Sequence, residues 1–157
     1  MTSRDQLIQQ RLQTSIQKCQ MHLQRLQYAS NQIAELFPLT VDKYNSVSEA
    51  TIGNIDQMVF RFTKLQDEIG NNTFRFLLEF LQEDIANKPF RDILNILEQL
   101  QIIDTSDTWL TLREIRNDLT HEYPMMLDET IEKLNLLYNQ LPRLAHILVT
   151  IEQKVTQ

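Results

Sequence analysis

The chain has few of the residues that interrupt helices or cross-link a fold. Its 157 residues include 2 glycines, 4 prolines and 1 cysteine. The single cysteine, Cys19, excludes an intrachain disulfide and any multi-cysteine zinc site, and this cysteine usage fits a reducing cytoplasm. Because breakers are scarce and Leu, Gln, Ile and Glu are common, the composition predicts long helices.

The sequence also lacks a long apolar run and an excess of positive charge. Its first residues, MTSRDQLIQQ, do not have the basic-then-apolar order of a signal peptide, and no apolar run is long enough to cross a bilayer. We therefore expect a cytoplasmic protein that does not engage a membrane. The formal net charge of −6 argues against a protein that coats nucleic acid, because such binding neutralises many phosphates. A small local basic site is still compatible with this charge.

Apolar residues recur at spacings of three and four along most of the chain, which is the pattern of amphipathic helices. No stretch alternates with the period of two that marks a strand. The length suffices for one core, so we expect a single all-α domain over residues 1–157, with the long first and last helices side by side. The predicted helices cover about residues 3–34, 47–69, 74–85, 89–100, 108–123 and 128–155.

Caps and breakers predict where these helices begin and end. Ser46 with Glu49 three residues later forms a capping-box sequence at the start of the second helix. Gly70 suits a left-handed residue that ends this helix, and Asn72 suits the next N-cap. Pro142 is expected to kink the last helix.

One segment, TWLTLREIRNDLTHEYPMM at residues 108–126, combines a helical pattern with two arginines, an asparagine, a histidine and a tyrosine. Asp107 is its expected N-cap, and Pro124 limits the helix. With a rotation of about 100° per residue, the apolar side chains of the segment form one inward stripe. This stripe consists of Trp109, Leu112, Ile115 and Leu119.

Arg116 falls on the inward stripe, between Trp109 and Leu112. A guanidinium at such a position needs partners, because an unpaired buried charge is very costly. In one interpretation its stem packs on Trp109 while its head reaches a carboxylate or the surface. In the other, Arg116 faces an anion such as a phosphate.

Two further polar residues follow Arg116. Asn117 and His121 lie four residues apart, so the amide can orient the imidazole, although a polar outer face with a histidine near the helix end explains them equally well. Arg116 and His121 point about 140° apart on an ideal helix. They converge only if the helix ends between them, as Pro124 allows, or if a second protomer completes the site.

Other chemistry-bearing patterns are missing from the sequence. Gly53 and Gly70 stand alone, so there is no glycine-rich phosphate loop. There is also no His-Glu-x-x-His pair, calcium loop or cysteine cluster, and we expect neither a metal nor a cofactor. His22 and His146 lie on long packing helices without an acidic neighbour four residues away, so we interpret both as structural.

Arg116, four intervening residues, His121, any residue and then Tyr123 resemble the Arg-x4-His-x-Tyr motif of HepT-like toxins. These toxins belong to the HEPN superfamily of small helical ribonucleases, and Asn117 directly after the arginine also matches the HEPN pattern. Residue-level resemblance is confined to this motif helix. It implies a HEPN-like up-and-down bundle of about five helices. It further implies a homodimer whose two motifs line one cleft and a metal-independent endoribonuclease.

The resemblance gives each motif residue a role. His121 would be the base that activates the RNA 2′-hydroxyl near neutral pH, and Arg116 would stabilise charge on the phosphate oxygens. Asn117 would orient the substrate or His121. Arg113, one turn earlier, would hold a neighbouring phosphate, although a solvated surface residue is an equally good explanation.

The resemblance also implies a partner, a minimal nucleotidyltransferase that acts as antitoxin in a type VII toxin–antitoxin system. It would transfer adenylate to Tyr123, which is otherwise a packing aromatic, and the added charge and bulk would block an RNA phosphate. The chain lacks the Gly-Ser signature of a nucleotidyltransferase, so it would be the recipient. The alternatives are a non-catalytic nucleotidyltransferase substrate-binding module and a helical interaction protein that uses its first and last helices.

Overall fold

The computed structural model describes residues 1–122 and 127–157, with only the backbone at Glu122. In the described residues all regular structure is helical, which confirms the predicted all-α class. None of the described helices is long and apolar enough to span a membrane. The helices are α1 (Ser3–Gln32), η1 (Ala34–Leu36), α2 (Val41–Ser46), α3 (Glu49–Glu68), η2 (Ile69–Thr73), α4 (Phe74–Phe80), α5 (Phe90–Gln99), α6 (Ser106–Glu122) and α7 (Leu127–Thr156).

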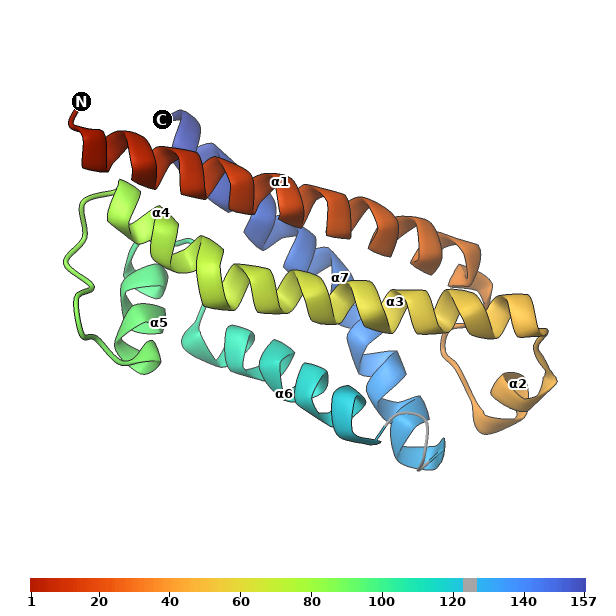
Figure 1. The fold of residues 1–157 in the computed structure, drawn as a ribbon. Helices are drawn as coiled ribbons and strands as arrows, with labels where there is room; N and C mark the ends of the chain where they lie inside the picture. Colours follow the sequence, from red (N-terminus) through yellow and green to blue (C-terminus); the bar gives the residue numbers. More distant parts are fainter. Residues whose placement is uncertain (123–126) are drawn as a thin grey trace.

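The long helices form a bundle in which α3 is central (Figure 1). α1 packs most extensively on α3 and runs antiparallel to it, and α6 lies on the other side of α3. α7 crosses behind these helices and contacts both α1 and α6. The expected contact between the first and last helices is therefore present, although the main neighbour of α1 is α3. α7 remains one helix through Pro142.

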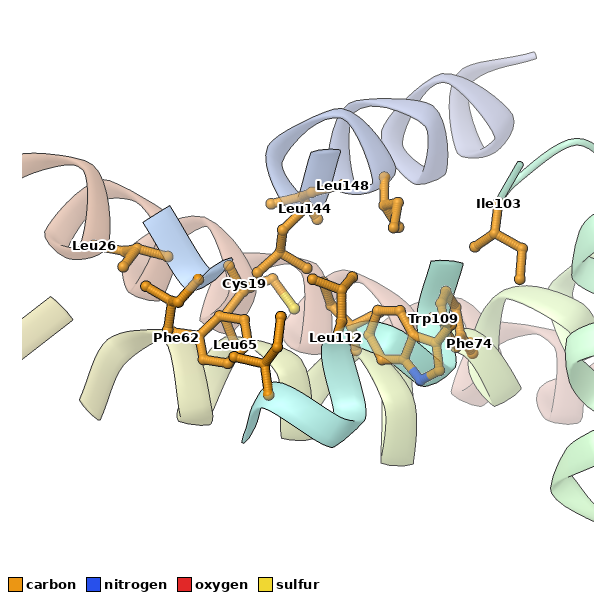
Figure 2. Packing of buried hydrophobic residues seen from close by; sticks show 14 of the residues in the cluster. Cys19, Leu26, Phe62, Leu65, Phe74, Ile103, Trp109, Leu112, Leu144 and Leu148 are labelled. Atoms are coloured by element: carbon orange, nitrogen blue, oxygen red, sulfur yellow. The ribbon is translucent and has the colours of Figure 1, made fainter. Parts of the chain in front are cut away.

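The core is a continuous apolar cluster contributed by all the long helices (Figure 2). Its largest fully buried side chains include Trp109 of α6, Phe62 of α3 and Phe74 of α4. The rings of Trp109 and Phe74 meet edge to face, with centroids 4.7 Å apart, a favoured aromatic geometry. Cys19 lies fully buried in the same cluster, where it packs as a small apolar side chain.

The predicted break at Gly70 and Asn72 is wrong. The chain passes from α3 into α4 through one turn of π-helix, Ile69–Thr73, and no described glycine has a positive φ. The Thr73 hydroxyl donates to the Glu68 carbonyl oxygen at 3.2 Å, and the Glu68 carboxylate accepts hydrogen bonds from Ser15 at 2.7 Å and Asn72 at 3.1 Å. The first bond gives a partner to a backbone carbonyl where α3 meets the π-helical turn, and the other two hold the Glu68 carboxylate beside that turn.

Gly70 is required for packing and not for a left-handed turn. A Cβ at this position would lie 3.0 Å from Cζ2 of Trp109 and 3.5 Å from its Nε1. The absence of a side chain therefore allows the indole of α6 to rest against the backbone of the π-helical turn.

Two predicted helix starts are also wrong. Ser48 caps α3, where its Oγ accepts from the Thr51 amide at 3.2 Å, while Ser46 ends the unpredicted α2. α6 begins at Ser106, one residue before the predicted cap Asp107. The Thr105 Oγ1 accepts from the Thr108 amide at 3.2 Å and serves as the cap.

α4 also ends earlier than predicted, at Phe80 instead of Ile85. Gln82 takes a left-handed conformation with φ of 64°. The amide of Glu83 donates to the Leu78 carbonyl at 2.9 Å. This is a Schellman ending, in which a glutamine occupies the position that usually holds glycine.

The two glycines should respond in opposite directions to alanine. Gly53→Ala places a Cβ with no neighbour within 4 Å, so it should raise the free energy of unfolding by about 0.5–1 kcal/mol through helix propensity. Gly70→Ala pushes on the buried indole and should lower the free energy of unfolding by about 1–3 kcal/mol. Urea unfolding followed by circular dichroism measures both, and equal stabilisation by the two variants would contradict the proposed role of Gly70.

Candidate functional site

The motif helix α6 is positioned by its inward stripe. Trp109, Leu112, Ile115 and Leu119 are all buried, as the periodicity predicts. The indole and Leu112 point into the common core (Figure 2). This packing fixes the rotation of α6 about its own axis, and with it the directions of the polar motif residues.

Arg116 is held by Asp67 of α3 in a two-point ion pair. Its Nε donates to Oδ1 of Asp67 at 2.9 Å and its Nη2 donates to Oδ2 at 2.8 Å. The hydrogen bonds that Arg116 donates to Asp67 raise the pKa of Arg116 above its ordinary value, against the opposing effect of burial. The head of Arg116 thus reaches a carboxylate, which is one of the two arrangements that the sequence left open.

The ion pair leaves part of the guanidinium for other ligands. The Arg116 and Asp67 side chains are 25% and 34% exposed. Nη1 of Arg116 donates to Oδ1 of Asn117 at 3.4 Å, so three of the five N–H donors of an arginine are used by described residues. The described contact of Asn117 is with Arg116 and not with His121.

His121 lies exposed in the last turn of α6. Since α6 is continuous to Glu122, the helix does not end between Arg116 and His121, and that route to their convergence is wrong. At about 100° per residue, the two side chains leave α6 about 140° apart. Within one protomer the helix therefore does not bring them together. Tyr123 and Pro124 lie outside the described residues.

A polar pocket of about 460 Å³ opens beside Arg116, between α6, α5 and the π-helical turn. Three arginines and one carboxylate, that of Asp67, line it. The Arg113 guanidinium lies over the ring of Phe90, 5.3 Å from its centroid. The full lining is Gln66, Asp67, Gly70, Asn71, Arg75, Phe90, Trp109, Arg113, Arg116 and Asn117.

In the part of the chain that the structure describes, His22 and Cys19 do not form a second site. Nδ1 of His22 accepts a hydrogen bond from Arg61 at 3.0 Å, since arginine can only donate. Burial and the charge of Arg61 lower the pKa of His22. Burial raises the pKa of Cys19 to about 12, which keeps the thiol protonated. Among the described residues, no three His, Cys, Asp or Glu side chains are placed to hold a metal ion.

Comparisons with protein-family models, with curated proteins and with solved structures find no match for this chain. The motif residues and their geometry are therefore the basis for assigning a function. Sequence reasoning missed Asp67, Arg75 and Phe90, which lie on three other segments of the fold. No local pattern could link Asp67 to a residue 49 positions away.

Proposed function

We propose that this chain is the endoribonuclease toxin of a HEPN/nucleotidyltransferase toxin–antitoxin system. The observation that carries the proposal is that Arg116, on the motif helix, is held in one orientation by an ion pair and is still partly exposed. A two-point pair with Asp67 fixes this guanidinium, which is still one-quarter exposed at the edge of a polar pocket. A fixed cation with remaining N–H donors is suited to stabilising charge on phosphate oxygens.

The reaction requires a base and a phosphate clamp. His121 removes the proton from the RNA 2′-hydroxyl, and the 2′-oxygen attacks the adjacent phosphorus. The bond from phosphorus to the 5′-oxygen breaks, and that oxygen takes up a proton. The products are a 2′,3′-cyclic phosphate and a 5′-hydroxyl. Arg116 binds the phosphate oxygens throughout the reaction. The reaction only exchanges one phosphorus–oxygen bond for another, so it uses no redox step.

The angle between the two motif side chains means that the proposed active site needs two protomers. Arg116 and His121 diverge by about 140° on one helix. In a two-fold dimer that places the motif helices face to face, Arg116 of one protomer meets the partner's His121. Two equivalent composite sites would then line one cleft.

Cleavage should depend on both motif residues. His121→Ala should lower the rate of RNA cleavage by about 10²–10⁴-fold, because the base is lost, and Arg116→Ala by about 10²–10³-fold. His146→Ala removes another exposed histidine, on α7, and is the matched control that should cleave normally. The measurement is metal-free cleavage of total RNA by the purified dimer, with circular dichroism and chromatography to verify fold and assembly.

Two results would contradict this assignment. Full activity in His121→Ala would remove the proposed base. A wild-type dimer that binds the transferase stably but cleaves no RNA would favour the non-catalytic substrate-binding module.

Neutralisation by the partner transferase is the second part of the proposal. Tyr123 follows His121 by two residues, so an adenylate on it would place negative charge beside the motif. Co-expression with an active minimal nucleotidyltransferase should add the mass of at least one adenylate to the wild-type chain and none to Tyr123→Phe. Intact-mass spectrometry measures this, and an unmodified wild-type chain would refute the role of Tyr123.

A further inference from the structure

The pocket beside Arg116 is lined by two arginines in addition to the one that pairs with Asp67. Asp67, its one carboxylate, is engaged by Arg116. Arg75 comes from α4 and Arg113 from α6, and the described residues form no ion pair with either. The lining thus carries a net charge of about +2 in a chain whose net charge is −6. Such local focusing of one sign of charge raises the concentration of an oppositely charged ligand.

The shape of the pocket depends on the π-helical turn. Gly70 and Asn71 belong to this turn and line the pocket, and Trp109 forms the adjoining wall. π-turns within helices occur frequently at functional sites. The Nε1 of Trp109 is buried and has no hydrogen-bond partner among the described residues. A buried donor without an acceptor is unusual, but this nitrogen is shielded from solvent, so the binding proposed below does not use it.

The two arginines approach the pocket from different helices. Packing over Phe90 limits the rotation of the Arg113 guanidinium, and a planar guanidinium binds phosphate through paired N–H donors. The volume, about 460 Å³, lies in the range of small-molecule sites. Size, positive charge and planar donors together suit a nucleotide phosphate better than a metal or an apolar ligand.

We propose that this pocket binds a phosphate group of a nucleotide, clamped between Arg75 and Arg113, next to the ion-paired Arg116. The nucleotide is either a unit of an RNA strand or a free mononucleotide. As a site for an RNA strand the pocket deepens the ribonuclease proposal and rests on it, since Arg113 already has a phosphate role there. Arg75 and Phe90 are additions to that site, and binding of a free mononucleotide would not require cleavage.

Trp109 is the only tryptophan of the chain and lines the pocket, so its fluorescence reports on occupancy. The wild-type protein is titrated with AMP, inorganic phosphate and a short 2′-O-methyl oligoribonucleotide, which cannot be cleaved through its 2′-oxygen. At least one of these probes should change the fluorescence in a saturable way. The affinity should weaken as salt is added.

Arg75→Gln and Arg113→Gln should each weaken binding by about tenfold or more, because each removes a charge-assisted hydrogen-bonding group. Arg143→Gln is the control: Arg143 lies exposed on α7, donates to Gln140, and does not line the pocket. Its binding should equal that of the wild type. Unfolding curves of all three variants verify the fold, and Arg113 is exposed, so its substitution should leave the core intact.

The three probes of the titration distinguish a free nucleotide from an RNA strand as the ligand. Arginine-dependent binding of AMP supports a free nucleotide, whereas arginine-dependent binding of the oligoribonucleotide alone supports an RNA strand. No saturable binding of any probe, or equal weakening by Arg143→Gln, would overturn the pocket assignment. Neither result bears on cleavage by Arg116 and His121, which has its own test.

Discussion

The contact between the Trp109 indole and the backbone of Gly70 holds α6 against the π-helical turn that continues α3. Trp109 is fully buried and packs edge-on against Phe74, and a Cβ at residue 70 would lie only 3.0 Å from its ring. The π-helical turn provides this close approach, and the side chains of its residues Asn72 and Thr73 donate hydrogen bonds to Glu68 at the end of α3. With α6 seated in this way, Arg116 reaches Asp67 at ion-pair distance.

The electrostatics of the site follow from the position of α6. The pair with Asp67 orients Arg116, and its partial exposure limits its contribution to stability to about 1 kcal/mol or less, so its main effect is geometric. Arg75 and Arg113 keep their charge available on the same side of α3. The proposed chemistry thus combines one cation fixed by a carboxylate, a phosphate pocket beside it, and a histidine, His121, that points elsewhere. In the proposed dimer, a second protomer joins them.

Periodicity predicted what depends on local sequence: the long helices, the all-α class and the buried stripe of α6. It failed at the end of α4, because Gln82 occupies the left-handed position after the helix where glycine is the usual signal. It also misread Gly70, because close approach to a distant side chain and a left-handed turn both select glycine. Asp67 could not be predicted as the partner of Arg116, because only the tertiary packing of α6 on α3 brings these two residues together.

The claim that one active site is shared between two protomers is tested most directly by mixing two inactive variants. Arg116→Ala and His121→Ala chains are unfolded together, refolded into dimers, and assayed for RNA cleavage. Random pairing makes half of the dimers mixed, and each mixed dimer has one of its two sites intact, so about a quarter of wild-type activity should return. Activity no higher than that of the separate variants would contradict the composite site, and with it the dimeric ribonuclease proposed for this chain.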